Sequence, residues 1–356
     1  MRTDLFDFDL PDGNIALHPV KPRDAARLLV VPVHGPFEDR IVRDLPTFFR
    51  SGDVLVVNES RVIPAALEGV RPARQDGEDV AVKLNLIERL DETTWRAFAK
   101  PGRRLRPGDT VQIAGPNSGL SVEILEKGDG GIVTVRLNAV GGAVQDALRA
   151  NGMAPLPPYI ADRREYSPSD ATDYQTIYAA PDGASVAAPT AGLHFTPDLM
   201  AALEAQGVQI VKVCLHVGSG TFLPVKAEDT SDHVMHFEQF EISGAAAAAI
   251  NAAKAEGRRV TAVGTTSLRA LESAALREGQ VAPGLRSTDI FITPGYRFKI
   301  VDRLMTNFHL PRSTLFMLVS AFSGLETMQR AYRHAIAHGY RFYSYGDASL
   351  LERADG

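Results

Sequence analysis

Strand and helix patterns alternate from about residue 155 to the C-terminus, and this feature restricts the fold of the chain more than any other. A helix over 197–207, capped by Thr196, is followed by an apolar run at 208–215 that predicts a buried strand. An alanine-rich helix over 243–257 is likewise followed by a strand pattern at 259–263. Such alternation predicts a largely parallel sheet with helices on its faces.

The same alternation continues to the end of the chain. The pattern predicts a helix over 267–277, a strand at 289–292, helices over 313–322 and 326–338, and a last strand at 340–345. These elements would extend the sheet rather than start a new domain.

A different pattern occupies residues 67 to 138. Short β-branched or aromatic runs lie at 80–86, 94–98 and 121–125, and a glycine-rich turn at 128–131 leads into a further run at 132–137. No helical period interrupts this region, so we expect a small all-β, barrel-like domain.

The order of these patterns predicts how the two domains are connected. A buried-strand run at 53–58 precedes the all-β region and resembles the strands that follow it. We therefore expect a large α/β domain with a mostly parallel sheet, built from both chain ends (residues 1–66 and 153–356) and carrying the cleft. The small β-barrel domain, residues 67–152, would be inserted into it. A length of 356 residues also favours two domains.

Composition limits the compartment and the partners. No apolar run approaches the roughly 18 residues that a membrane span needs, and the first residues lack the apolar core of a signal peptide. The single cysteine, Cys214, excludes an internal disulfide and fits a reducing compartment, so we expect a cytoplasmic protein without membrane contact. The net charge of −5 means that any nucleic acid must be held by a local basic patch.

Polar loops follow three of the expected strands. They lie at 216–222, 264–267 and 293–296. Because open α/β sheets bind ligands beyond the carboxyl ends of their strands, these loops predict a shared cleft.

Two glycine-containing loops allow more specific hypotheses. Gly218 and Gly220 resemble the start of a dinucleotide-binding loop, but Leu223 replaces the third glycine and no helix follows. The segment 264–266 opens a helix, so it is either an anion site or an ordinary helix start. The sequence favours neither of these last two interpretations.

Histidines supply further candidates. His194 and His309 lie in loops ahead of helices, where a single histidine is more often a structural hydrogen-bonding group than a catalyst. His233, His236 and Glu238 suggest a metal site, but an extended segment would point the two histidines to opposite faces. We therefore expect no metal.

A basic turn in the small β domain is the candidate RNA contact. It carries Lys100, Arg103, Arg104 and Arg106 among prolines and a glycine. A solvated surface turn is the alternative, and charge counting alone favours that alternative.

Segments spread over nearly the whole chain resemble the S-adenosylmethionine:tRNA ribosyltransferase-isomerase family of queuosine biosynthesis. The matching segments are 8–11, 22–29, 52–58, 61–65, 156–160, 174–179, 186–196, 215–225, 233–238, 264–266, 291–296, 306–314 and 340–348. The chain departs from the family's usual residues at Ser60, Ala66, Ala81, Cys214 and Ser349.

The resemblance implies a two-domain monomer and an activity. The ribosyl group of S-adenosylmethionine (SAM) would pass to the 7-aminomethyl-7-deazaguanine (preQ1) wobble base of tRNA, with release of adenine and methionine. SAM would be consumed as a substrate, and no separate cofactor is implied. A SAM- or tRNA-binding module without catalysis and an enzyme for a small-molecule amine remain the alternatives.

For this reaction we hypothesise that His194, His216, Glu238 and His309 include the general acid and base, with their roles left open. The candidate substrate-binding residues are Asn58, Arg61, Thr190, Gly192, Gly218, Gly220, Thr221, Gly264, Thr265, Thr266, Arg269, Thr306, Asn307, Tyr345 and Asp347.

Overall fold

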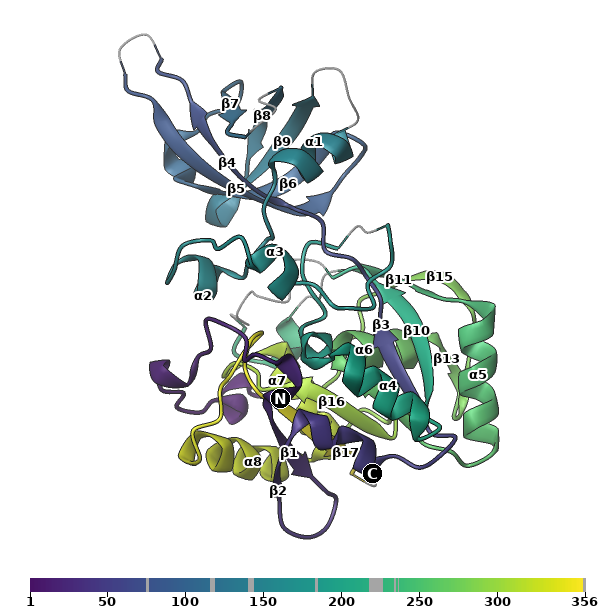
Figure 1. The fold of residues 1–356 in the computed structure, drawn as a ribbon. Coiled ribbons are helices and arrows are strands. Elements are labelled where there is room, and N and C mark those ends of the chain that lie inside the picture. Colours follow the sequence, from purple (N-terminus) through teal and green to yellow (C-terminus); the bar gives the residue numbers. More distant parts are fainter. Residues whose placement is uncertain are drawn as a thin grey trace. The chain divides into compact units, whose positions relative to one another are not determined.

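The chain forms two compact units in a computed structural model that describes residues 1–74, 77–115, 119–139, 144–182, 185–217, 227–233, 235 and 237–354. The α/β unit comprises residues 1–60, 175–181 and 188–356, and the barrel unit comprises residues 61–174 and 182–187 (Figure 1). The barrel unit is wider than the range 67–152 that the sequence predicted. Ala65 packs in the barrel core, and Met153 pairs with Ala66 of the first barrel strand, which extends the unit on both sides.

A mixed sheet, nine strands wide among the described residues, forms the centre of the α/β unit. In spatial order its strands are β15 (Gly284–Thr288), β11 (Glu238–Ile242), β10 (Gln209–Leu215), β3 (Val54–Asn58), β12 (Val260–Val263), β16 (Arg303–Asn307), β17 (Ala348–Glu352), β1 (Arg27–Val31) and β2 (Glu38–Ile41). The block β10-β3-β12-β16 is parallel throughout, and β1 pairs in parallel with β17. The other pairings are antiparallel. The carboxyl ends of the parallel block therefore lie at one edge of the sheet.

Helices surround this sheet. They are α4 (Pro197–Ala205), α5 (Gly244–Ala255), α6 (Gly264–Ala274), α7 (Thr314–Ser323) and α8 (Leu325–Ala337). The predicted caps are confirmed, since the side chains of Thr196 and Ser243 accept hydrogen bonds from amides in the first turns of α4 and α5. Strand β3 is buried along its whole length, and its residue Leu55 belongs to the same core as Leu199 of α4. A strand covered on both faces explains the continuous apolar run at 53–58.

Two strand predictions in the last third of the chain are wrong. The strand expected at 289–292 instead spans Gly284–Thr288, where it pairs with β11 at the edge of the sheet. The loop 293–296 consequently does not follow a strand of the parallel block. The strand that does belong there, β16, contains Arg303, Thr306 and Asn307, and these polar residues hid it from a search for apolar runs.

The last strand also lies further along the chain than predicted. Residues 340–345 form turns, and the strand is β17, at Ala348–Glu352. A side-chain Cβ at Gly346 would lie 2.5 Å from the carbonyl oxygen of Arg341, so only glycine allows this turn to close. The helix predicted to reach residue 277 ends at Ala274, where a two-stranded hairpin of β13 (Ala275–Arg277) and β14 (Gln280–Val281) begins.

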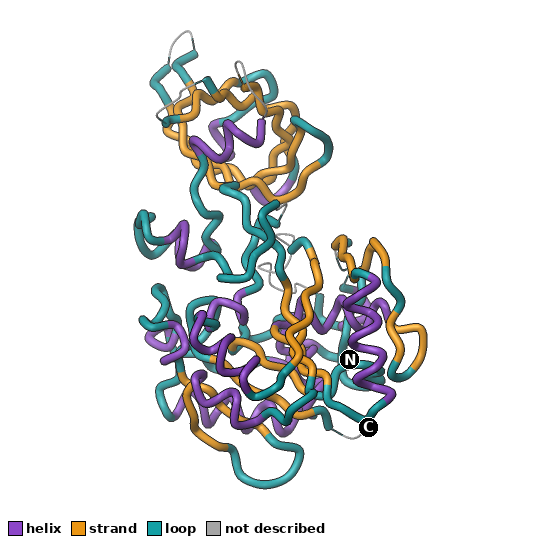
Figure 2. The backbone as a smooth tube through the Cα atoms, turned by 45° about the vertical axis from the view of Figure 1, so that its right-hand side comes forward, coloured by secondary structure: helices purple, strands orange, loops and turns teal. Residues whose placement is uncertain are grey.

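The barrel unit contains a closed antiparallel barrel, which Figure 2 shows as a ring of strands. Its strands, in order around the ring, are β4 (Ala66–Arg71), β5 (Val80–Arg89), β6 (Thr94–Lys100), β9 (Ile132–Ala139), β8 (Leu120–Lys127) and β7 (Thr110–Ile113). The glycine-rich turn expected at 128–131 connects β8 and β9, which pair antiparallel. Leu84, Trp95 and Val135 lie in the barrel core, and α1 (Val144–Asn151) packs on that core through Leu148. Two short helices, α2 (Pro158–Ala161) and α3 (Asp170–Asp173), complete the unit.

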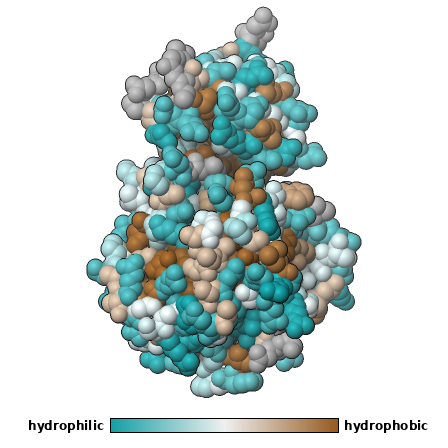
Figure 3. All heavy atoms as spheres, turned by 90° about the vertical axis from the view of Figure 1, so that its right-hand side faces the viewer, coloured by the Kyte–Doolittle hydropathy of each residue, from teal (hydrophilic) through white to brown (hydrophobic). Residues whose placement is uncertain are grey.

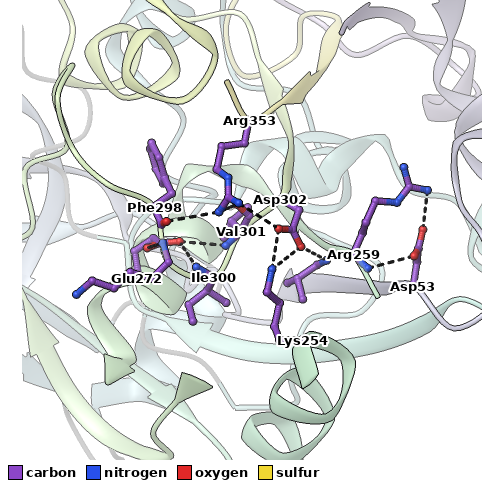
Figure 4. A network of polar contacts seen from close by, with 11 residues as sticks. Asp53, Lys254, Arg259, Glu272, Phe298, Ile300, Val301, Asp302 and Arg353 are labelled. Carbon is purple, nitrogen blue, oxygen red and sulfur yellow. Dashed lines mark hydrogen bonds and ion pairs between the residues drawn. The ribbon is translucent and has the colours of Figure 1, made fainter. Parts of the chain in front are cut away.

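A polar network stabilises the amino-terminal ends of the parallel strands, at the edge opposite the predicted cleft (Figure 4). Asp53, immediately before β3, accepts a hydrogen bond from Arg259, immediately before β12. Asp302 precedes β16 and pairs with Lys254 of α5. Glu272 of α6 accepts the amides of residues 299–301 at 2.9–3.0 Å. The carboxylates of this network are all paired with cations or amides, so we assign this edge a structural role, although Arg259 Nε has no partner among the described residues.

On the face drawn in Figure 3, hydrophilic residues predominate over the barrel unit, and hydrophobic patches lie mainly on the α/β unit. Large apolar side chains that are exposed in the α/β unit include Phe237, Leu276 and Leu285. Among the described residues, no helix is long and apolar enough to span a membrane.

Candidate active site

The carboxyl edge of the parallel block brings together many of the predicted site residues. Asn58 ends β3, His216 follows β10, Gly264 follows β12 and Asn307 ends β16. Because β17 runs antiparallel to β16, Asp347 lies at the same edge. Neighbouring strands are about 4.8 Å apart, which places the ends of β10 and β12 about 10 Å from each other. The edge is therefore wide enough to hold a nucleoside-sized ligand.

The Asn58 side chain holds two strands together. Its Nδ2 donates to the carbonyl of Leu215 at 3.0 Å, and its Oδ1 accepts from the amides of Leu215 and Ser60 at 3.0 and 3.1 Å. Asn58 is 1% exposed. These contacts fix the end of β10, and with it the position of His216.

Asn307 similarly connects three segments. Its Oδ1 accepts a hydrogen bond from Thr190 at 2.9 Å, and its Nδ2 donates to the carbonyl of Tyr343 at 3.1 Å. Tyr343 has a positive φ of 73°, which is unusual for a large side chain. Asn307 thus holds a strained turn against the end of β16.

Both ring nitrogens of His194 face backbone oxygens. Nδ1 lies 3.0 Å from the carbonyl of Ala191, and Nε2 lies 3.0 Å from the carbonyl of Gly346. Burial lowers the pKa of His194, although the two carbonyls and Asp347 act in the opposite direction. A neutral imidazole donates from one nitrogen only, so one of these contacts is a hydrogen bond and the other is a close approach of two acceptors. Both nitrogens are nevertheless enclosed by the backbone, and this geometry favours a positioning role.

His309 is also engaged by its neighbours. The Tyr332 hydroxyl accepts from the His309 amide at 3.0 Å and lies 3.3 Å from its Nδ1, so the hydroxyl donates to Nδ1. Nε2 lies 3.2 Å from the Thr306 hydroxyl. Burial lowers the pKa of His309 to about 3. A neutral ring with these partners is a poor source or acceptor of protons at neutral pH.

Glu238 forms a buried ion pair with Arg269 of α6. Both side chains are less than 10% exposed. The Nε of Arg269 donates to the carbonyl of Ile290, and its Nη2 has no hydrogen-bond partner among the described residues. The ion pair joins β11 to α6, and it leaves one buried guanidinium N–H group without an acceptor.

Other predicted residues have structural partners or lie elsewhere. Asp347 accepts from Arg341 and from the Arg27 amide. Gly192 leaves room for the Tyr178 hydroxyl, which would lie 2.1 Å from an added Cβ. Tyr345 is buried at this edge, and Arg61 belongs to the barrel unit. Gly218, Gly220, Thr221 and His236 lie outside the described residues.

His216 differs from the other two candidate histidines because its ring is partly exposed. Among the described residues its Nδ1 has only long contacts, at 3.4 Å with the Ser60 hydroxyl and at 3.9 Å with Cys214 Sγ. Burial lowers the pKa of His216, and the charge of Glu241 acts weakly in the opposite direction. The ring is therefore neutral at neutral pH and able to accept a proton.

A groove of about 440 Å³ lies beside this histidine, between β10 and α5, and is lined in part by Glu59, Lys212, Cys214 and Glu241. Cys214 Sγ lies 3.8 Å from His216 Nε2. Burial and the two glutamates raise the pKa of Cys214 to about 11, so the thiol is not ionised. Sequence reasoning missed Glu241 because only the antiparallel pairing of β11 with β10 places it opposite Cys214.

The first turn of α6 occupies the middle of the edge. Gly264, Thr265 and Thr266 are all buried. Val263 precedes the helix, and no side chain of the described residues caps its first amides. The first amides of an α-helix have no acceptor within the helix, and they lie at the positive end of its dipole.

The basic turn predicted to contact RNA lies in the barrel unit and includes a short 3₁₀ helix at Gly102–Arg104. Arg103, Arg104 and Arg106 are exposed, and no described carboxylate pairs with their side chains. Lys100, by contrast, forms an ion pair with Asp162 at 2.9 Å.

The α/β unit carries polar residues at the carboxyl ends of its parallel strands, where such sheets bind ligands. The barrel interrupts the sequence of this unit. The class of protein is therefore an α/β enzyme with an inserted barrel. The model of the queuosine biosynthesis protein family matches residues 3–351, and the chain belongs to this family.

Full-length relatives carry one enzyme name. The S-adenosylmethionine:tRNA ribosyltransferase-isomerase of Maricaulis maris is 59% identical over 355 residues, which cover 99% of both chains. The protein of the same name from a Methylobacterium species is 58% identical over 363 residues, covering both chains completely. The crystal structure of S-adenosylmethionine tRNA ribosyltransferase from Thermotoga maritima is 33% identical and has a TM-score of 0.52, with 97% of this chain and 99% of that chain covered.

Proposed function

We propose that this chain transfers and isomerises the ribosyl group of SAM onto the preQ1 wobble base of tRNA. Adenine and methionine leave, and the product is epoxyqueuosine-tRNA. SAM is consumed as a substrate, and no separate cofactor or metal takes part. The observation that carries this proposal is identity of 57–59% with relatives of that name along essentially the whole chain.

The test is to incubate the chain with SAM and preQ1-containing tRNA and to follow adenine and methionine by mass spectrometry. We expect both products to be released only when the tRNA is present. Release without tRNA would indicate a small-molecule enzyme instead. SAM binding without any release would indicate a binding module, and either result would refute the proposal.

Within this reaction we infer that His216 is the general base. A sulfonium acidifies the protons on the neighbouring ribose carbon, so a neutral imidazole can remove one of them. In His194 and His309 both ring nitrogens face groups of the protein, and Glu238 is paired with Arg269. His216 combines partial exposure with a lowered pKa, which supports this role.

Replacement of His216 by glutamine tests the assignment. General-base catalysis contributes roughly 10²–10⁴-fold, so kcat should fall by that order while the Kd for SAM changes little. The wild-type kcat should decline at acidic pH as His216 becomes protonated, and the variant should lack this decline. His338→Gln, at an exposed histidine after α8, is the control and should retain full activity. Full activity of His216→Gln would refute the assignment.

We further propose that Arg103, Arg104 and Arg106 contact the tRNA backbone. Several other cations of the barrel are matched by acids, for example Lys83 by Glu68 at 2.8 Å. The three arginines, which no carboxylate of the described residues pairs, therefore form a local basic patch on an acidic chain, which is what phosphate binding requires.

Salt dependence distinguishes phosphate contacts from a solvated turn. Each lost contact should reduce the slope of log affinity against log salt by about 0.7–0.9, so replacing the three arginines by serine should reduce it by about 2–3. A control with Lys83, Arg96 and Arg136 replaced by serine removes paired cations of the same barrel. Equal effects of the two triple variants would contradict the proposed patch.

We also place the protein in the cytoplasm, where its tRNA substrate is found, and expect it to be a monomer. Light scattering after size-exclusion chromatography should give a mass close to 38.5 kDa. A mass twice as large would contradict the monomer.

A further inference from the structure

The buried start of α6 has more hydrogen-bond donors than the described residues satisfy. Thr265 and Thr266 are 6% and 9% exposed, and no side chain among those residues caps the amides of this turn. Buried helix ends normally have a capping side chain, water or a ligand as their partner. The helix is eleven residues long, so its dipole adds a positive potential at this end.

The Thr266 side chain supplies a second, independent observation. Its Oγ1 is buried and has no hydrogen-bond partner in the part of the chain that the structure describes. It lies 3.5 Å from the position that a Cβ on Gly264 would occupy, so the hydroxyl points back toward the start of the helix. A hydroxyl buried in this way is unfavourable unless something accepts its proton.

Arg269 adds a third unsatisfied donor. It lies three residues after Thr266, and side chains at this spacing share one face of a helix and lean toward its N-terminus. Nη1 of Arg269 pairs with Glu238, whereas Nη2 has no partner within the described ranges. Donors without acceptors, next to a helix N-terminus, are suited to an anion.

We propose that the first turn of α6, with Thr266 Oγ1 and Arg269 Nη2, binds the α-carboxylate of the methionyl part of SAM. This inference rests on the proposed function, which makes SAM the substrate. Burial favours this carboxylate over a tRNA phosphate. A phosphate within a polynucleotide is flanked by chain on both sides and needs an open surface, whereas a terminal carboxylate on a flexible chain reaches a buried turn.

Calorimetric titration of the full chain with SAM and with decarboxylated SAM tests the proposal. The two ligands share the sulfonium, the amine and the adenosine, and they differ in the carboxylate. Wild-type protein should bind SAM at least tenfold more tightly. Thr266→Val should weaken SAM binding roughly 10–100-fold and change the Kd for decarboxylated SAM less than about twofold. Thr266→Ser, which restores the hydroxyl, should recover SAM binding.

Thr261→Val is the matched control. Thr261 Oγ1 is also buried without a partner among the residues described, but it lies within β12 rather than at the start of α6. This variant should bind both ligands as the wild type does. Melting temperatures verify that the variants fold, and the comparison of the two ligands on wild-type protein needs no variant.

Equal affinity of wild-type protein for the two ligands would overturn the inference, as would an equal loss for both in Thr266→Val. Loss of tRNA binding in Thr266→Val, with SAM binding intact, would identify the anion as a phosphate and would also overturn it. Failure of the proposed function is distinguishable, because that function is tested by the tRNA-dependent release of adenine and methionine, whereas this inference is tested by the affinities for SAM and decarboxylated SAM alone.

Discussion

Protonation of His309 should make the folded protein less stable as the pH falls. Its pKa is lowered to about 3 by burial, whereas the side chain has a pKa of about 6.5 when the chain is unfolded. Below about pH 6.5 the unfolded chain takes up a proton that the folded chain does not, and above this pH the group has no effect. The stability is therefore present at neutral pH and is lost as the pH falls toward 3.

The magnitude follows from these two pKa values. Between about pH 7.5 and about pH 5, the difference in proton uptake at one group lowers the free energy of unfolding by about 2 kcal/mol. His309→Asn removes the titration and keeps an acceptor near the Tyr332 hydroxyl. The variant should be less stable than the wild type at neutral pH, and this difference should shrink by about 2 kcal/mol at about pH 5.

Urea unfolding at both pH values measures this difference, and other titrating groups cancel in the comparison. Circular dichroism follows the helices, and the single tryptophan, Trp95, reports on the barrel unit separately. If the free energy of unfolding of the wild type and of His309→Asn changes equally between the two pH values, burial does not lower the pKa of His309. That result would also reopen His309 as a proton donor or acceptor.

Three further substitutions test the buried polar groups. Glu272→Ala removes the acceptor of three backbone amides and should destabilise the protein by roughly 3 kcal/mol in urea unfolding. Asp53→Asn removes the negative charge that pairs with Arg259 and Arg303. It should lower the free energy of unfolding by roughly 3–5 kcal/mol, again measured with urea. Glu238→Gln leaves Arg269 unpaired and should cost a similar amount, together with weaker SAM binding in calorimetry.

Glu256→Gln provides the common control for these variants. Glu256 is 62% exposed and pairs with Arg258 at the surface, where such pairs contribute about 0–1 kcal/mol. The free energy of unfolding should fall more in the three buried variants than in this control. If it does not, the assigned contacts do not form.

The sequence correctly predicted those elements whose pattern of apolar residues, or whose capping residue, directly reflects how they are buried or where they begin. Strand β3 is apolar along its length because both of its faces are covered, and α4 and α5 begin where Thr196 and Ser243 cap them. The barrel was visible for a related reason, since its strands alternate buried and exposed residues around a single core. Fold class and helix starts are therefore predictable from local chemistry.

Strand β16 could not be recognised in this way. Its polar residues are accommodated by distant partners, since Arg303 donates to the carbonyl of Phe48 and Asn307 is held by Thr190. Patterns of apolar residues do not reveal such long-range satisfaction of polar groups.

The site shows the same limit. His194 and His309 lie at the expected edge, but only the structure shows which groups they contact. The carbonyl opposite His194 Nε2 belongs to Gly346, which is 152 residues away in the sequence. Thr266 Oγ1 and Arg269 Nη2 lack hydrogen-bond partners among the described residues, and this depends on contacts that a sequence does not show.

Isotope labelling gives a direct test of whether the chain transfers a ribosyl group from SAM to tRNA. Two SAM samples are used, one with ¹³C in the ribosyl carbons and one with ¹³C in the methyl carbon. After reaction with preQ1-tRNA, the tRNA is digested and its wobble nucleoside is analysed by mass spectrometry. If the ribosyl group is transferred, this nucleoside acquires the complete ribosyl label and none of the methyl label. Methyl label in the tRNA, or no label from either sample, would contradict it.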